Sequence, residues 1–86
     1  MILQIVSIRD SAANAYTRPV FVHSIGQAIR SFQDEINREG ENNEMNRHPQ
    51  DFELYHLGTF NDQNATFEPL TNGPTLLTRG ADLKRT

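Results

Sequence analysis

Apolar residues follow strand-like spacing at the start of the chain. Residues 1–9 are rich in Ile, Val and Leu and place apolar side chains on both faces, as a central strand does. Residues 18–22 then alternate, and Pro19 cannot donate a ladder hydrogen bond, so this second strand is expected at a sheet edge or beginning at the proline. The polar and Ala-rich segment between the two strands predicts a short loop or a single helical turn.

The clearest element is a helix between residues 24 and 40. Five apolar residues recur at helical spacing and form one stripe: Ile25, Ala28, Ile29, Phe32 and Ile36. Ser24 and Gln27 match a capping box, and Gly40 is a natural stop. Three charged residues at i, i+4 spacing mark the opposite face: Arg30, Asp34 and Arg38. An amphipathic helix of this kind packs its apolar stripe on a core.

No periodicity runs through residues 39–51, which are therefore expected to form a mobile loop. Its one large apolar residue, Met45, is expected to attach it to the core. Near the end of the chain, residues 75–78 predict one more short strand. The segment 79–86 is locally basic and is expected to be a flexible tail.

Residues 52–60 predict another strand, followed by a hairpin. Phe60 and Phe67 lie on either side of a polar turn in which Asn64 can tolerate a left-handed conformation, so the two rings are expected to pair across the ladder. Regular alternation would place five residues on one face of this strand: Phe52, Leu54, His56, Gly58 and Phe60.

Together these elements predict an α+β fold, in which one amphipathic helix packs on a small antiparallel sheet of four to five strands. Eighty-six residues without an internal linker make a single domain, 1–86. So short a chain buries only a thin core, and it contains no Trp, so we expect it to form a homo-oligomer. The five phenylalanines are expected in the core.

Composition limits the compartment and the chemistry. The absence of cysteine removes disulfides, thiolate metal ligands and thiol nucleophiles, and it suits a reducing cytoplasm. The first ten residues carry neither a signal-peptide pattern nor a membrane span, so no membrane association is expected. The net charge is −3, but Glu39, Glu41 and Glu44 lie in one loop, and the remaining acids and bases balance. This balance argues against a protein that coats nucleic acid by bulk electrostatics.

The polar stretch 48–60 raises the question of a metal or acid/base site. Alternation along a strand makes Glu53 and His56 diverge, and His48 and Asp51 precede the strand across a proline. Zinc ligands are normally more regularly spaced. No Gly-rich phosphate loop and no nucleophile elbow are present. We therefore expect no metal site, no cofactor and no enzymatic activity, with His56 as a core or interface imidazole.

Four phrases occur in the same order between residues 6 and 83, a span of nearly the whole chain: "VSIRDSAANAYTRPVFV", "AIRSFQDEINR", "NEMNRHPQDFELYHLGTF" and "LLTRGADL". Together they resemble the small non-structural protein of gokushovirus-type microviruses, which are single-stranded DNA bacteriophages. The resemblance implies a protein made in the host bacterial cytoplasm and absent from the mature capsid. It also implies DNA binding and a role in turning replication from duplex copying to single-stranded genome synthesis and packaging. It brings no catalytic residues.

The residues themselves offer a modest nucleic-acid site. Single strands are held by cations along a groove together with aromatic side chains on which bases stack. We expect the following cationic and aromatic side chains at the surface: Arg9, Tyr16, Arg18, Arg47, Tyr55, Arg79, Lys84 and Arg85. An oligomer would multiply such weak contacts. The competing hypothesis is a protein-interaction module that contacts a replication initiator or a procapsid component without binding DNA, which the lack of excess positive charge favours.

Overall fold

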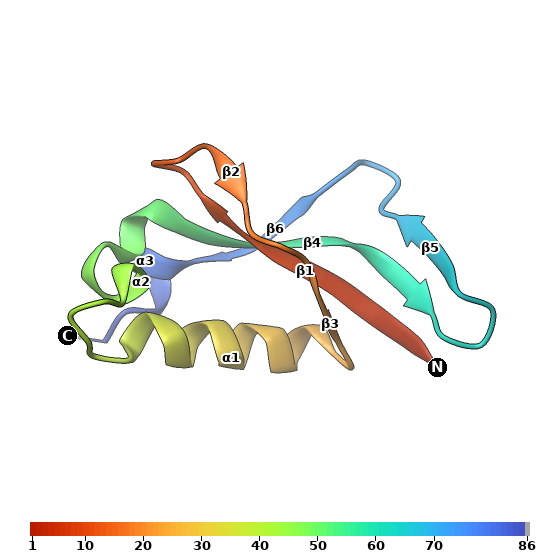
Figure 1. Ribbon diagram of the computed structural model, residues 1–86, viewed down its shortest axis with the longest axis horizontal. Helices are drawn as coiled ribbons and strands as arrows, with labels where there is room; N and C mark the ends of the chain where they lie inside the picture. The colour runs from red at the N-terminus through yellow and green to blue at the C-terminus, as the bar shows by residue number, and fades with distance from the viewer. Residues whose placement is uncertain (86) are drawn as a thin grey trace.

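Two long antiparallel strands, β1 (Ile2–Asp10) and β4 (Phe52–Asn61), form the centre of the computed structural model, which describes residues 1–85 (Figure 1). The free edge of β1 pairs with β2 (Ala15–Tyr16) and β3 (Val20–Val22). The free edge of β4 pairs with β5 (Thr66–Pro69) and β6 (Thr75–Arg79). The result is one six-stranded, entirely antiparallel sheet, with β1 and β4 at its centre and the four shorter strands along their outer edges.

Helices occupy three places in the chain. The longest, α1 (Ile25–Asn37), lies under one half of the sheet, and α2 (Glu44–Arg47), the 3-10 turn η1 (Pro49–Asp51) and α3 (Gly80–Leu83) gather beyond its end (Figure 1). None of the helices within residues 1–85 combines the length and apolar character that a membrane crossing requires.

The predicted fold class, a sheet of four to five strands with one helix, is wrong. The structure is mostly β, with 39% strand and 28% helix, and has six strands and three short α-helices. The additional strand is β2, whose two residues are too few to show a period. It forms because Asn14, at a φ of 55°, turns the chain back onto β1. The additional helices are single turns that tertiary contacts stabilise, which local sequence does not predict.

Helix α1 begins as its sequence predicts. The Ser24 side chain accepts a hydrogen bond from the Gln27 backbone N–H at 3.2 Å. The apolar stripe packs on one face of the sheet and forms a small core, whose fully buried members are Val6, Ala28, Phe32, Ile36 and Leu54. The predicted spacing of Arg38 with Asp34 is replaced by an i, i+3 pair, in which Arg38 binds Glu35 at 2.7 Å.

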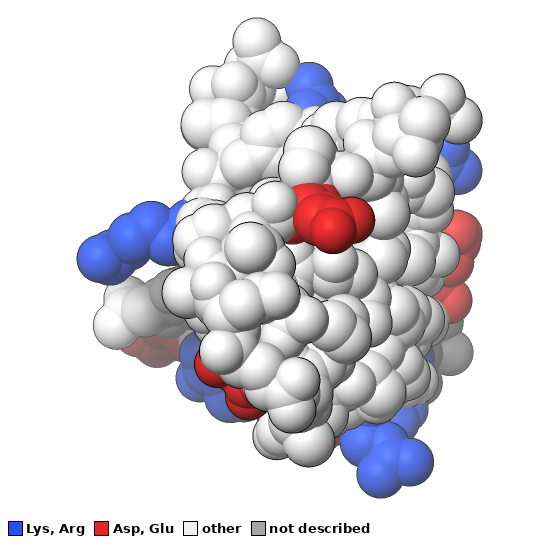
Figure 2. Space-filling model, turned by 90° about the vertical axis from the view of Figure 1, so that its right-hand side faces the viewer, with Lys and Arg blue, Asp and Glu red and all other residues white. Residues whose placement is uncertain are grey.

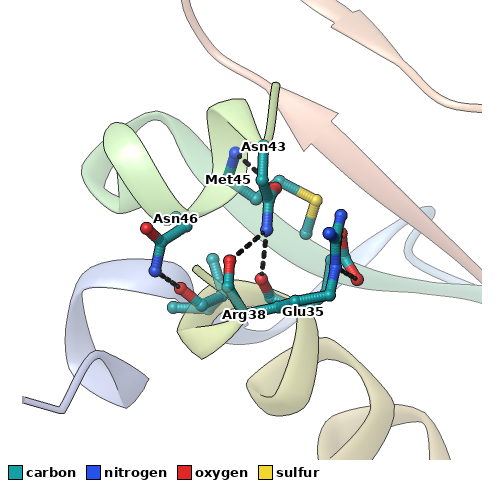
Figure 3. A network of polar contacts seen from close by, with 6 residues as sticks. Glu35, Arg38, Asn43, Met45 and Asn46 are labelled. Carbon is teal, nitrogen blue, oxygen red and sulfur yellow. Dashed lines mark hydrogen bonds and ion pairs between the residues drawn. The ribbon is translucent and has the colours of Figure 1, made fainter. Parts of the chain in front are cut away.

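A buried asparagine donates hydrogen bonds to backbone carbonyl groups at the end of α1 (Figure 3). Asn43, 5% exposed, donates through Nδ2 to the carbonyls of Glu35 and Arg38, at 2.9 and 2.8 Å, and accepts from the Met45 N–H through Oδ1. Asn46 donates to the Ile36 carbonyl at 3.0 Å. The final carbonyls of a helix have no partner within it, so these amides replace water there. The segment predicted as a loop thus contains α2 and η1, and the contact of Met45 with the core is confirmed.

A bulge in β4 changes which face its residues occupy. Ile5 pairs with Gly58 but Val6 pairs with His56, so Leu57 is an extra residue in the ladder. Paired residues share a face, and the bulge therefore puts Phe60 on the face opposite to Leu54. The prediction that regular alternation keeps Phe60, Gly58 and Leu54 together is wrong, because it assumed an unbroken strand.

Gly58 also allows β5 to approach. A Cβ atom at this position would lie 2.2 Å from the Glu68 carbonyl oxygen and 2.9 Å from the Pro69 Cα. The close approach holds the β4–β5 hairpin in register, with Phe60 directly opposite Phe67 and ring centroids 4.8 Å apart, which confirms the predicted pair. The left-handed residue of this hairpin is Ala65, at a φ of 59°, rather than Asn64.

The sheet extends well beyond the helix. The molecule measures 42 × 22 × 20 Å, and the end that carries the N-terminus and β5 projects past α1 (Figure 1). Consequently one face of the sheet is half covered by α1, and the opposite face, which we call the open face, is free of helices (Figure 1). The open face is where the candidate site lies.

Candidate nucleic-acid interface on the open face

Three charged residues form a row across one end of the open face. The register pairs Glu53 of β4 with Arg9 of β1 on one side and with Arg79 of β6 on the other. The Glu53 carboxylate lies 3.4 Å from Arg9 Nη1 and 3.5 Å from Arg79 Nε. Arg9 also donates to Asn14 Oδ1 at 2.8 Å. The two guanidinium groups are thus held side by side by one carboxylate.

The members of this row differ in how far they reach solvent. The side chain of Arg79 is 61% exposed, whereas those of Arg9 and Glu53 are 28% and 19% exposed. A half-buried carboxylate between two arginines offsets one of their charges and fixes their positions. The net charge of the row is one positive charge, presented mainly by Arg79.

Two tyrosines adjoin the arginine row. Tyr16 pairs with Arg9, and Tyr55 lies opposite Ser7, two residues before Arg9 on the same face. Their rings meet edge to face with centroids 5.4 Å apart, and Tyr16 remains 47% exposed. Such a ring offers a flat surface on which a base can stack. We call Arg9, Arg79, Tyr16 and Tyr55, with Glu53 between the arginines, the Arg/Tyr site.

Thr17 positions Tyr16 at this edge. Between β2 and β3, Thr17 bonds to Ile8 in both directions: its N–H donates to the Ile8 carbonyl at 2.8 Å, and its Oγ1 accepts from the Ile8 N–H at 3.0 Å. Ser7 Oγ donates to the Thr17 carbonyl at 2.7 Å. Side-chain hydroxyls therefore continue the ladder where the backbone strand is interrupted, and they fix the tyrosine that precedes Thr17.

The remaining candidate residues lie apart from the Arg/Tyr site. Arg18 lines an apolar cavity of about 240 Å³ between β1, β3 and α1, on the helix side of the sheet. Arg47 ends α2 and lies 3.6 Å from Glu44. Lys84 follows α3, and the backbone N–H of Arg85 donates to Asn37 Oδ1 at 2.7 Å. The structure thus brings together Arg9, Tyr16 and Arg79, and it separates them from the other four.

A second aromatic group occupies the other end of the open face. Phe21, Phe60 and Phe67, which we call the Phe patch, have neighbouring ring centroids 4.8 to 6.2 Å apart. Phe21 and Phe67 are 47% and 64% exposed. The prediction that all five phenylalanines lie in the core is therefore wrong for the three members of the Phe patch, because the bulge at Leu57 and the pairing of the short strands turn them to the open face.

Among residues 1–85, no three side chains of the metal-binding types come together. His56 is half-buried, and its Nε2 lies 3.1 Å from the Gly58 carbonyl, which fits an imidazole that fills space and makes one hydrogen bond. The Arg38 hydrogen bonds hold the pKa of Glu35 below its ordinary value, and this pair lies on α1, away from the open face.

Glu53 is the residue of this interface that sequence reasoning missed. The strand pattern showed that Glu53 leaves the same face as Tyr55, but which cations lie opposite depends on pairing with two strands distant in sequence.

Comparison with known proteins identifies a family. No curated protein and no solved structure matches the chain. A family model described as Phage ORF5 protein matches residues 3–83, which is nearly the whole chain.

Proposed function

Because the chain belongs to the Phage ORF5 protein family, we propose that this bacteriophage protein is a non-enzymatic DNA-binding accessory protein of a small single-stranded DNA phage of the microvirus type. In this proposal it acts in the host cytoplasm and assists the switch from duplex replication to single-stranded genome synthesis and packaging. The Arg/Tyr site is the surface that binds the single strand.

One observation carries the proposal: a pair of tyrosine rings lies beside two arginines on a sheet face that no helix covers. Open antiparallel sheets with exposed aromatic residues are a recurring platform for single-stranded nucleic acid, since bases stack on the rings while cations contact the backbone. Each stacked base contributes roughly 1 to 3 kcal/mol. Tyr16 is the ring that offers an accessible face, and Tyr55 supports it from the side.

The net charge on the Arg/Tyr site sets the expected affinity for a single strand. Arg9 and Arg79 share Glu53, so binding is weak for one subunit and depends on salt. For single strands, log K falls against log salt with a slope of about −0.7 for each neutralised phosphate, so two phosphate contacts give a slope near −1.4. The stacking part of the free energy persists at high salt.

The test is fluorescence anisotropy of a labelled thymidine oligonucleotide titrated with the protein at several salt concentrations. Arg79→Ala is expected to weaken binding to all sequences alike and to reduce the salt slope by about 0.7. Tyr16→Ala is expected to weaken binding roughly tenfold or more at every salt concentration, since it removes a stacked base. Arg30→Ala, which removes the same charge from the exposed face of α1, is the matched control and should leave affinity nearly unchanged.

The second candidate is a protein-interaction module that contacts a replication initiator or a procapsid component and does not touch DNA. The observation that favours it is the shared carboxylate, which leaves the two arginines with one net positive charge in a chain whose net charge is −3. Absence of oligonucleotide binding at low salt would decide for this candidate.

A further inference from the structure

The Phe patch forms the largest exposed aromatic group on the open face and lies at the end of the sheet beyond α1 (Figure 1). Figure 2, which views the molecule from that end, shows a mostly uncharged surface with one acidic group near its middle and basic side chains only at the periphery. At the tip of this end the N-terminal amino group is paired with Asp62 at 2.8 Å. This surface therefore offers little to attract a polyanion.

A shallow pocket adjoins the patch. Its volume is about 260 Å³, and its lining is almost entirely apolar. Phe21 and Phe67 form two of its walls, Ile5 and Leu57 line it from the sheet, and neither Lys nor Arg is among its lining residues. A cavity of roughly 150 Å³ can hold a benzene ring, so this pocket has room for an aromatic side chain.

We propose that a second copy of this chain docks on the Phe patch and that each copy inserts apolar side chains into the pocket of the other. The occupant is a protein and not a nucleic acid because the lining of the pocket is almost entirely apolar and contains no cation. A symmetric dimer brings one patch against itself, which suits a surface of uncharged rings with no complementary patch required elsewhere.

The exposed area is of the right order for this role. An aromatic side chain presents roughly 150 to 250 Å², so Phe21 and Phe67, 47% and 64% exposed, contribute about 200 Å² between them. Four more apolar side chains extend this surface toward the several hundred Å² at which an apolar patch marks an interaction site. They are Leu3, Pro19, Phe60 and Pro69. A standard interface buries about 800 Å² on each partner, so residues around the Phe patch have to supply the remainder as a rim.

The thin core gives a reason for the dimer. Among residues 1–85 only six hydrophobic residues are buried, and within that range the half of the sheet that projects beyond α1 has no helix on either face (Figure 1). Domains of this size are marginally stable, and burial of the projecting half against a second copy would add apolar contacts there. This inference does not depend on DNA binding, since the Arg/Tyr site lies at the other end of the open face.

The first test is the oligomeric state, measured by sedimentation equilibrium over a range of protein concentrations. The wild-type chain should form dimers, and Phe67→Glu should raise the dimer dissociation constant about 30-fold or more, the loss that removal of a central aromatic anchor brings. Thr66→Glu adds the same charge at the preceding residue of β5, whose side chain leaves the other face, and should change dimerisation little.

The second test does not require a destabilising charge. Because the chain contains no cysteine, Phe67→Cys introduces a single thiol on the Phe patch, and Thr66→Cys introduces one on the opposite face. Under mild oxidation Phe67→Cys should form a disulfide-linked dimer at least tenfold faster than Thr66→Cys. Equal rates, or a wild-type chain that stays monomeric at high micromolar concentration, would overturn the proposal.

Oligonucleotide binding tests the alternative that the Phe patch binds nucleic acid and not a second copy of the chain. If Phe67→Glu keeps the dimer of the wild type and instead loses affinity for the thymidine oligonucleotide, the patch binds bases and the dimer proposal is wrong. If Phe67→Glu is monomeric, its salt slope for oligonucleotide binding per subunit should equal that of the wild type, because the Arg/Tyr site remains intact.

Discussion

Glu53 and Arg79 lie opposite each other in the β4–β6 ladder, with Glu53 Oε2 3.5 Å from Arg79 Nε. The same carboxylate reaches Arg9 on the other neighbouring strand. A carboxylate in this position both orders the two guanidinium groups and competes with phosphate for them. Its removal therefore has opposite effects on the stability of the protein and on its affinity for DNA.

Glu53→Gln should raise the affinity for single-stranded oligonucleotide roughly twofold to fivefold, because loss of a partly exposed ion pair changes the interaction by up to about 1 kcal/mol. The measurement is anisotropy at low salt. Glu68→Gln, which removes the same charge from β5 at the far end of the sheet, is the control and should have a smaller effect. A decrease in affinity for Glu53→Gln would mean that the carboxylate contacts the ligand.

Asn43→Ala should lower the free energy of unfolding by about 1 to 3 kcal/mol, because it leaves the carbonyls of Glu35 and Arg38 without the amide donor they share. In a domain of this size each kcal/mol corresponds to roughly 4 to 8 °C in Tm. Asn42→Ala alters the neighbouring exposed residue and should change stability by no more than about 0.5 kcal/mol. Equal Tm values for the two variants would show that the buried amide does not hold the end of α1.

Gly58→Ala should destabilise the chain by about 1 to 3 kcal/mol, because the added methyl group meets the backbone of Glu68 and Pro69 and forces β5 away from β4. Chemical denaturation is the appropriate measurement. Gly26→Ala provides the matched control: a Cβ there meets nothing within 4 Å among the described residues, and alanine stabilises a helix by up to about 1 kcal/mol over glycine. If Gly58→Ala leaves the free energy of unfolding unchanged, the hairpin accommodates the methyl group without loss of stability.

The Glu35–Arg38 pair should make stability depend on pH in the acid range. Hydrogen bonds from Arg38 hold the pKa of the Glu35 carboxyl below its ordinary value of 4.5 in the folded chain. This contribution is fully present above pH 4.5 and is lost as the pH falls below 4.5 through the lowered pKa. Thermal unfolding between pH 6 and pH 3 should therefore show a smaller acid loss for Glu35→Gln than for wild type, and an unchanged profile would contradict the pairing.

The local sequence pattern was sufficient to predict those elements whose residues contact residues close to them in sequence. The helix could be predicted because its apolar stripe and its Ser24 cap lie within a few residues of one another, and both are confirmed. Pro19 limited β3 to a sheet edge or to a start at the proline, and the edge position is confirmed. The Phe60–Phe67 pair followed from the turn residues between them. In each case the deciding contact spans a short stretch of chain.

The candidate site was predicted only in part, because its contacts join strands that are distant in sequence. Arg9, Tyr16 and Arg79 could be chosen as exposed cations and an aromatic, but their convergence depends on pairing of β1 with β4 and of β4 with β6, which are distant in sequence. The same pairing places Glu53 between the arginines. Arg18, Arg47, Lys84 and Arg85 were equally plausible from residue type, and the fold puts them elsewhere.

The sequence by itself determined the helix, the long strands and the absence of cysteine chemistry, since these depend on residue type and on near-neighbour spacing. Only the tertiary structure decided which face each half of β4 presents, because one extra residue at Leu57 reverses the alternation beyond it. That reversal turns Phe60 away from the core and creates the Phe patch. A bulge depends on how two strands fit each other, and a periodic pattern in either strand alone does not contain that information.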